Sequence, residues 1–425
     1  MAKTNQAEID IANANAKVKD EQQPKLPWMF SWAMFLAPMV WYGPNIAVRN
    51  TLIPQLFGQI DPANKVWAFG IISAAATFTG AITNLLFGAF SDVTRSRWGS
   101  RKPYITIGTL VMAAMMVIIA NSASVMTIIF LWIICAAGEN AVAASIYAQI
   151  SDRVAPKWRG TASTFYGVGF TISQQAFTIL AAQFLGNIKF GIYAMALISV
   201  ILGIVHLLLA KEPSNLDEPK ISINKETFAK YFFFPTKGAR DFYLALFAKF
   251  FMVVGSTIIT TYTLFIFTDY MGVTSQQAGK SISIFSTLML VFGVIFALIS
   301  GPLADRAKRV KMPVLFAIFL LGFAALFPLF IAHPWAMYAY AVFAAIGNGI
   351  FNSVDGALNL NVLPSSDTAG KDLGLINLAN TLSQMIGALA ASAIVSTMGY
   401  QKIFLVAIIL ELIGAALIAM IRSVK

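Results

Sequence analysis

Charged residues are scarce in this sequence. Only 12% of its 425 residues are Asp, Glu, Lys or Arg, about half the fraction that is usual in soluble domains. Hydrophobic residues make up 58%, and the mean hydropathy is +0.73. A soluble globule cannot bury so much apolar surface, so the composition excludes that class and indicates a chain whose solvent is lipid.

Cysteine is nearly absent, and the motifs of common enzyme classes are missing. The single Cys135 lies in an apolar run, so an intrachain disulfide and a Cys-pair metal site are both excluded. The sequence contains no P-loop lysine motif, no G-x-S-x-G and no H-E-x-x-H. We therefore expect no enzyme activity, no ATP-driven step, no metal and no organic cofactor.

The net charge of +11 does not indicate nucleic-acid binding. The cations form short clusters between apolar runs, and no groove-reading basic motif is present. Such clusters are typical of loops that face an anionic membrane surface. The expected partners are the lipid bilayer and a small-molecule substrate, with no nucleic acid, and we expect a monomer.

Twelve apolar runs are long enough to cross a bilayer, which requires about 20 residues per helix. They are too long, and lack the alternation, for β-barrel strands. The predicted fold class is an all-α membrane protein with twelve transmembrane helices. The runs are 28–57, 66–91, 103–121, 124–150, 160–185, 189–210, 241–269, 277–302, 312–331, 335–363, 371–395 and 401–421.

Lysine and arginine are distributed unequally between the two sides. The tails and the connections on their side carry 24 of these cations, whereas the other connections carry four. The positive-inside rule predicts that both termini are cytoplasmic. The polar N-terminus has no apolar segment of its own, so we interpret it as a cytoplasmic tail rather than a signal peptide. We expect a multi-pass protein of the bacterial cytoplasmic membrane.

The two halves of the sequence repeat each other. Gly88 and Asp92 match Gly301 and Asp305 at an offset of 213, and the Ser-Gln pair at 173–174 recurs at an offset of 210. Near-constant offsets predict two similar six-helix bundles with a cavity between them. The predicted domains are a tail (1–26), an N-terminal bundle (27–210), a cytoplasmic linker (211–240), a C-terminal bundle (241–421) and a short C-terminus (422–425).

The loop between the second and third runs resembles a known signature. Two six-helix halves with G-x-x-x-D and a basic run at this place are similar to the major facilitator superfamily. More narrowly, the loop resembles the D-x-T-x-(S/T)-R-(W/F)-G-x-R-(R/K)-P form of the sugar:cation symporters, which are the glycoside–pentoside–hexuronide group and the related sucrose and disaccharide:proton symporters. The matching residues are Asp92-Val93-Thr94 and Arg97-Trp98-Gly99-Ser100-Arg101-Lys102-Pro103, and the segment from Asp152-Arg153 to Arg159-Gly160 is also similar.

The resemblance implies uptake of a sugar or glycoside together with a cation, by rocking of two bundles. Symporters of the melibiose-permease type bind sodium through Asp residues in the second helix. The run 66–91 has no Asp, so this sequence favours protons over sodium as the coupling ion.

A charge network beside this loop is the predicted cytoplasmic gate. Because Asp92 follows a helix end amid cations, it can pair with basic groups and lock the ends of the helices on that side. The gate comprises Gly88, Asp92, Arg95, Arg97, Arg101, Asp152 and Arg153, with Asp305 and Arg306 as the lesser partners in the second half.

Four ionisable residues stand out inside the apolar runs, where an unpaired charge costs several kcal/mol. Glu139 and Asp355 are the predicted proton-coupling carboxyls, because desolvation disfavours their charged forms; a static ion pair between Glu139 and Arg49 is the alternative. Arg49 and Lys249 either contact substrate, pair with these carboxyls, or extend to the membrane surface.

Amide and hydroxyl side chains follow the same helical faces as these charges. Amides donate and accept hydrogen bonds, which suits sugar hydroxyls, although they also join membrane helices to one another. The predicted substrate-binding residues are Tyr42, Asn45, Arg49, Asn140, Gln174, Gln175, Lys249, Asn348, Asn352, Asn377 and Gln384.

The sequence therefore predicts a secondary active transporter, with proton-coupled sugar symport as the first hypothesis. A proton-linked carrier of organic anions or a drug exporter is the alternative if Arg49 and Lys249 both face the cavity unpaired. A membrane sensor that does not transport is the third hypothesis.

Overall fold

The computed structural model describes residues 17–217, 239–307, 310–362 and 369–422. Within these ranges the chain is helical and contains no strand. Residues 1–16 of the expected tail and 218–238 of the expected linker lie outside the described residues.

A helix or a set of consecutive helices corresponds to each predicted run. The first run consists of α2, η1 and α3, and the seventh consists of α10, α11 and η2. The predicted all-α membrane fold is confirmed. The bounds are α2 Trp28–Ala47, η1 Val48–Leu52, α3 Ile53–Ile60, α4 Lys65–Val93, α5 Lys102–Ala120, α6 Val125–Arg153, α7 Pro156–Ala182, α8 Ile188–Leu209, α10 Arg240–Thr261, α11 Thr263–Phe265, η2 Ile266–Tyr270, α12 Ser275–Ala307, α13 Lys311–Phe330, α14 Pro334–Asn361, α15 Ala369–Met398 and α16 Gln401–Ala419.

Among the described residues, nine helices are long and apolar enough to cross a membrane. Three others, α2, α7 and α14, are not in that set. All three line the central cavity described below. Polar residues that face the cavity, such as Gln174 and Gln175 of α7 and Asn348 and Asn352 of α14, lower the hydropathy of these two helices.

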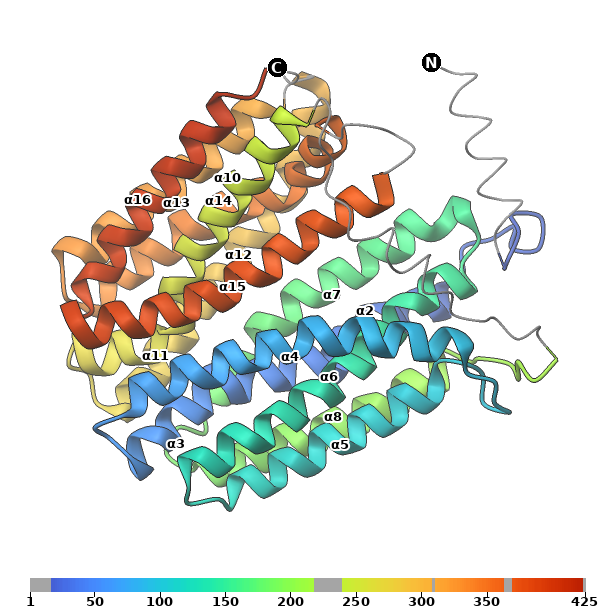
Figure 1. The fold of residues 1–425 in the computed structure, drawn as a ribbon, viewed down its shortest axis with the longest axis horizontal. Helices are drawn as coiled ribbons and strands as arrows, with labels where there is room; N and C mark the ends of the chain where they lie inside the picture. Colours follow the sequence, from blue (N-terminus) through green and yellow to red (C-terminus); the bar gives the residue numbers. More distant parts are fainter. Residues whose placement is uncertain (1–16, 218–238, 308–309, 363–368, 423–425) are drawn as a thin grey trace.

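The two halves form bundles with the same packing (Figure 1). In the N-terminal bundle α2 packs on α7 and α8, α5 on α6 and α8, and α4 on α6. In the C-terminal bundle α10 packs on α15 and α16, α13 on α14 and α16, and α12 on α14. The pattern is the same when α10 is matched with α2 and each later helix with its counterpart. The bundles meet through α4 on α15 and α7 on α12, which are also equivalent contacts.

Close helix contacts recur at equivalent positions. A Cβ atom on Gly138 of α6 would lie 2.9 Å from the carbonyl oxygen of Gly108 on α5. A Cβ atom on Gly347 of α14 would lie 2.8 Å from the carbonyl oxygen of Ala317 on α13. Small residues allow such backbone approach in membranes, so the repeat seen in the sequence is also a repeat in packing.

Each bundle also has a π-helical turn in the later part of its first run. In the N-terminal bundle the turn is η1, and Ile53 donates its N–H to the carbonyl of Val48. Pro54 follows directly; it has no N–H to donate, and in a regular α-helix its ring would crowd the carbonyl of Asn50, which favours the wider turn here. In the C-terminal bundle the turn is η2, where Met271 donates to Ile266. Such turns occur often at functional sites.

Candidate functional site

A cavity of about 470 Å³ lies between the two bundles. Six helical segments line it: α2 with η1, α7, α10 with α11, α12, α14 and α15. Its wall contains seven amide residues and many hydroxyls, and we call it the central cavity. The amides are Asn50, Gln174, Gln175, Asn348, Asn352, Asn380 and Gln384, of which all but Asn50 lie within the long helices; the hydroxyl residues are Thr51, Thr171, Thr178, Ser256, Thr257, Thr260, Thr261, Thr263 and Ser286.

The N-terminal wall carries Arg49 and a stacked aromatic pair. Arg49 lies in the π-helical turn η1, which places it on the cavity wall. Its Nε donates to Oδ1 of Asn50 at 3.1 Å. The rings of Tyr42 and Phe170 stack with their centroids 3.9 Å apart. These two residues also line the cavity and present a flat aromatic surface to it.

Glu139 is buried beside this wall on α6, with an exposed fraction of 8%. The positive charge of Arg49 interacts electrostatically with the carboxyl group of Glu139. Within the described part of the chain, however, no ion pair at 4.0 Å or less joins Glu139 to a cation. The structure therefore brings Arg49 and Glu139 into one region without the direct ion pair that was the alternative interpretation.

The C-terminal wall contains a direct ion pair. Nζ of Lys249 on α10 lies 2.6 Å from Oδ2 of Asp355 on α14. The same oxygen accepts from Nδ2 of Asn359 at 2.9 Å. Both charged side chains are mostly buried, with exposed fractions of 15% and 13%. Lys249 therefore neither extends to the membrane surface nor stays free for an anionic substrate.

Most of the other predicted substrate-binding residues line the cavity. Gln174 and Gln175 do so on α7, Asn348 and Asn352 on α14, and Gln384 on α15. The side chain of Asn377 lies outside the described part of the structure.

Two of the predicted residues lie off the wall. Asn45 is buried and its Nδ2 lies 3.9 Å from Sγ of Cys135. Asn140 donates to the carbonyl of Ala136 and lies against Gly80 of α4. Both amides face neighbouring helices of the same bundle, because a polar stripe on a helix is wide enough to meet a neighbour as well as the cavity.

One buried carboxyl was missed by the sequence analysis. Glu411 lies in the middle of α16, is 3% exposed and contacts Ser256 of the cavity wall. The sequence signal that could have found Glu411 is the presence of a single acid in an apolar run, because any ionisable residue at bilayer depth is a candidate.

The bundles are joined at the side away from the basic loops, which we call the opposite side. Lys65 of α4 forms an ion pair with Asp269 of η2 at 2.7 Å. Tyr400 also donates its hydroxyl to Asp269 at 2.9 Å. Further bonds between the bundles run from Gln55 to Ser275, from Gln183 to Ser283, and from Tyr262 and Ser392 to the carbonyl of Val66.

These contacts close the cavity on the opposite side. The labelled helices α3 and α11 lie together at that end, and the bundles diverge toward the ends where the termini lie (Figure 1). The central cavity therefore faces the side that carries residues 94–101, which we call the basic side.

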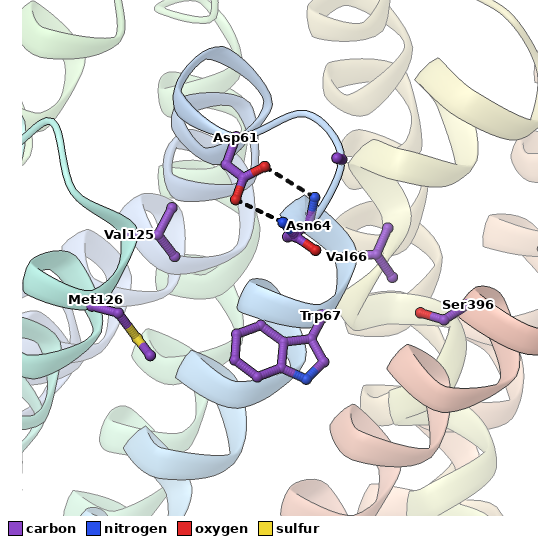
Figure 2. Close-up of a pocket in the computed structure, with 8 residues that line it drawn as sticks. Asp61, Asn64, Val66, Trp67, Val125, Met126 and Ser396 are labelled. Carbon is purple, nitrogen blue, oxygen red and sulfur yellow. Dashed lines mark hydrogen bonds between the residues drawn. The ribbon is translucent and has the colours of Figure 1, made fainter.

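Figure 2 shows a second depression, on the opposite side. It shares no lining residue with the central cavity. It is lined by Asp61, Asn64, Trp67 and Met126, among others. Asp61 accepts hydrogen bonds from the backbone and side-chain nitrogens of Asn64. Its acid is thus used to close the local turn, and the depression presents no converging set of groups for a ligand.

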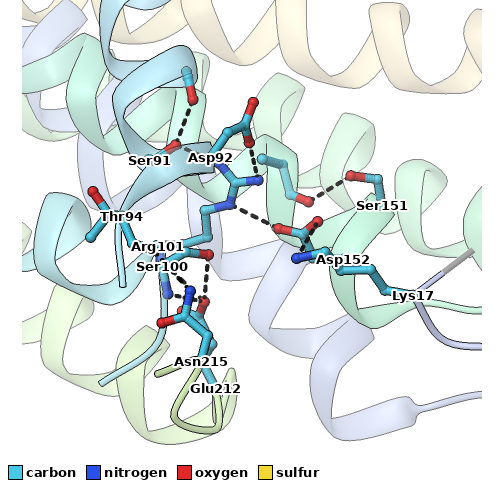
Figure 3. A network of polar contacts seen from close by, with 12 residues as sticks. Lys17, Ser91, Asp92, Thr94, Ser100, Arg101, Ser151, Asp152, Glu212 and Asn215 are labelled. Atoms are coloured by element: carbon cyan, nitrogen blue, oxygen red, sulfur yellow. Dashed lines mark hydrogen bonds and ion pairs between the residues drawn. The ribbon is translucent and has the colours of Figure 1, made fainter. Parts of the chain in front are cut away.

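The predicted gate contains a hub at Arg101 (Figure 3). The guanidinium donates from Nε to Asp152 at 2.8 Å and from its two terminal nitrogens to Asp92 and Ser91. Burial lowers the pKa of Arg101, but the Asp152 and Asp92 carboxylates outweigh burial and hold that pKa above its usual value. The hub therefore ties together the ends of α4 and α6 and the start of α5.

The linker is tied to the same loop. One oxygen of the Glu212 carboxylate accepts from the backbone nitrogens of Ser100 and Arg101, and the other accepts from that of Lys102. These N–H groups begin α5, where a negative charge is stabilised. Asn215 bonds to Ser96 and Thr94.

Other predicted gate residues have different positions. Arg95 donates to the backbone carbonyls of Asp92 and Thr94. Arg97 is exposed, and a Cβ atom on Gly88 would meet no atom within 4 Å. The carbonyl of Arg153 accepts from Gln23. The side chains of Asp305 and Arg306 lie outside the described part of the structure.

Two equivalent helical bundles around a polar cavity are the architecture of a secondary transporter. The sequence profile of the Major Facilitator Superfamily matches residues 30–296 and 250–425, which together include both bundles. The chain belongs to this superfamily and is a membrane transporter, not an enzyme.

Solved structures of transporters share this fold. A variant of the nucleoside transporter NupG has a TM-score of 0.69 and 17% identity; the match covers 94% of this chain and 100% of that one. A bacterial homologue of the human lysosomal transporter Spinster, solved in an inward-facing and unoccupied conformation, has a TM-score of 0.67 and 14% identity, covering 92% and 96%. A search of curated protein sequences found no significant match.

Proposed function

We propose that this transporter takes up a sugar or glycoside together with a proton, by alternating access. The observation that carries the proposal is the wall of the central cavity, where amides and hydroxyls from both bundles surround one space. Amides offer donors and acceptors together, as sugar hydroxyls require. The resemblance of residues 92–103 to the sugar:cation symporters supports the same substrate class.

The size of the cavity and its aromatic surface support this substrate class. About 470 Å³ lies within the range of small-molecule sites, which is roughly 300–1,000 Å³. The stacked pair of Tyr42 and Phe170 presents an apolar surface beside the polar wall. A pyranose ring has an apolar face of C–H groups and an edge of hydroxyls, so it would use both surfaces.

Glu139 is the proposed proton-coupling group. It is buried and has no ion pair within the described residues, so the protein does little to offset the cost of its charge. Arg49 interacts electrostatically with Glu139 and lies on the cavity wall. A change in the protonation of Glu139 can therefore alter how strongly Arg49 attracts a bound substrate. Asp355 is the second proposed carboxyl, and its ion pair with Lys249 would have to open for it to take up a proton.

The movement that the proposal requires is rocking of the two bundles. In this structure the bundles are joined at the opposite side and the cavity faces the basic side. We place the basic side in the cytoplasm because it carries the excess of Lys and Arg. Exposing the cavity to the exterior would then require the Lys65–Asp269 ion pair to break.

Organic anions are the second candidate substrate class. Arg49 lines the cavity, and its described hydrogen bond is to the neutral amide of Asn50. A substrate carboxylate could therefore pair with it. Lys249 argues against this class, because Asp355 already neutralises it.

Uptake into proteoliposomes tests the proposal. Labelled disaccharides, hexoses, hexuronides and nucleosides would be offered in turn under an imposed pH gradient, with a sodium gradient as the control. We expect a neutral sugar to accumulate only with the pH gradient, and Glu139→Gln to abolish accumulation. If hexuronides alone accumulate, the anion candidate is correct. If no sugar moves, or if Glu139→Gln accumulates substrate normally, the corresponding part of the proposal is wrong.

A further inference from the structure

The C-terminal bundle contains a buried carboxyl that the proposed mechanism does not use. Glu411 lies at the middle of α16 and has an exposed fraction of 3%. Its Oε1 accepts from the hydroxyl of Ser256 at 3.4 Å, and its Oε2 has no hydrogen-bond partner. One oxygen of a deeply buried acid thus has no hydrogen-bond partner among the described residues.

No cation offsets this carboxyl in the described part of the chain. The helices packed on α16 are α10, α13 and α15. On α10 the nearest cation along the helix is Lys249, which pairs with Asp355, while Arg240 and Asp241 lie at its basic-side end. On α13 the cation is Lys311, which donates to the carbonyls of Ala419 and Ile421.

The remaining neighbours are neutral. The described side chains of α15 include no titratable group. On α14, the titratable group that interacts electrostatically with Glu411 is the phenol of Tyr340. A buried carboxylate without a cation or enough hydrogen bonds costs several kcal/mol, so the neutral acid is the stable form of such a group.

The surroundings of Glu411 are shaped for its carboxyl group. A Cβ atom on Gly255 of α10 would lie only 3.1 Å from Oε1 of Glu411. A Cβ atom on Gly322 of α13 would lie 3.6 Å from Cβ of Glu411. The glycine at position 255 therefore leaves the space that the carboxyl group occupies, whereas a Cβ atom at Gly322 would make an ordinary van der Waals contact.

Ser256 connects this position to the central cavity. It lines the cavity and is also the hydrogen-bond partner of Glu411. A hydroxyl both donates and accepts, so it can pass a proton: it accepts one from the acid while its own proton moves to water in the cavity. The net change is one proton released to the cavity and a carboxylate left at Glu411.

We propose that Glu411 is a proton-binding site of the C-terminal bundle, protonated while the cavity faces the basic side, and that it exchanges its proton with the cavity through Ser256. The binding of the proton is independent of the substrate. A contribution of this site to coupling rests on the proposed function.

Infrared spectroscopy of the chain reconstituted in lipid vesicles at neutral pH tests proton binding directly. We expect the carbonyl stretch of a protonated carboxylic acid to lose intensity in Glu411→Gln, which has nearly the same shape. In Glu411→Asp the band should keep its intensity but shift in frequency. Asp152→Asn is the matched control: Asp152 forms an ion pair with Arg101, so its replacement should leave the protonated-acid band unchanged. An unchanged band in Glu411→Gln would overturn the proposal.

Exchange into heavy water tests the route. The band of Glu411 shifts when its proton is replaced by a deuteron, and Ser256→Ala should slow that shift by about tenfold, the factor that corresponds to one lost hydrogen bond. Equal exchange rates would refute the role of Ser256. No transported substrate is needed for either measurement, so failure of every sugar to accumulate would refute the proposed function and leave this site standing.

Discussion

Removing one partner of the Lys249–Asp355 ion pair should destabilise the C-terminal bundle, and removing both should largely restore its stability. In Lys249→Met the carboxylate of Asp355 keeps only the amide of Asn359 as a described partner. In Asp355→Asn the ammonium of Lys249 loses its carboxylate. Each single variant leaves one uncompensated charge on the wall of a membrane-embedded cavity.

The burial of the pair determines the size of the effect. Breaking a fully buried ion pair costs about 3–5 kcal/mol, and breaking an exposed one costs about 1 kcal/mol or less. The exposed fractions of 15% and 13% place this pair nearer the buried limit. Because water in the cavity reaches the remaining charge, we expect about 2–3 kcal/mol for each single variant. For a bundle of this size that corresponds to a fall in the midpoint of thermal unfolding of roughly 5–10 °C.

The assay is thermal unfolding of the wild type, both single variants and the double variant in the same detergent. In Lys249→Met with Asp355→Asn no charge remains to be solvated, so its midpoint should lie within about 3 °C of the wild type. If the loss in the double variant equals the sum of the two single losses, the residues are not energetically coupled. The ion pair would then not stabilise the bundle in the way its geometry indicates.

Three further predictions concern the ends of the helices. Asp92→Asn should slow transport while substrate binding persists. Its midpoint of thermal unfolding should change little, because Asp92 is 57% exposed. Asp152→Asn should lower that midpoint, because Asp152 is only 15% exposed. Lys65→Met should make the cavity more accessible from the opposite side, measured with a membrane-impermeant thiol reagent on a cysteine introduced into the cavity. Glu212→Gln should speed proteolysis of the linker, because a neutral amide caps the start of α5 by about 1 kcal/mol less.

The fold could be predicted from the sequence because the bilayer leaves few alternatives. A chain in lipid must satisfy its backbone within helices, so each long apolar run could be interpreted directly. The equivalence of the bundles was visible in Asp92 and Asp305 and is seen again in the packing of Gly138 and Gly347. The π-helical turns were not predicted, because the prolines of the first run, Pro38, Pro44 and Pro54, do not by themselves show where the helix is interrupted.

The site was predicted less completely, because a polar residue in a membrane helix faces either the cavity or a neighbouring helix. Asn348 and Asn352 line the cavity, whereas Asn359 on the same helix face supports Asp355. Asn45 faces Cys135 inside its own bundle. Sequence spacing places these residues on a face of a helix, but which neighbour that face meets depends on the rotation of the helix in the bundle.

The role expected for the charge network at Arg101, locking the helix ends on the basic side while the cavity faces the opposite side, stays a prediction for that other state. The described partners of Arg101, which are Asp92, Asp152 and Ser91, all belong to the N-terminal bundle. In this structure the hub therefore does not lock one bundle against the other. It makes the ends of α4, α5 and α6 move as one body, which is what rocking of a whole bundle requires.

The charges of the cavity wall offer a way to separate the two candidate functions. In both bundles the cation lies on the first helix and the carboxyl on the fourth, but Lys249 is neutralised by Asp355 whereas Arg49 has no direct ion pair among the described residues. The protonation of Glu139, which lies buried beside the wall, thus sets the net charge of this region. A neutral sugar carried with one proton moves one positive charge per cycle, which a membrane potential of 100 mV drives by about 2.3 kcal/mol. A monovalent anion carried with one proton moves no net charge, so dependence of uptake on the potential indicates a sugar, and independence indicates an anion.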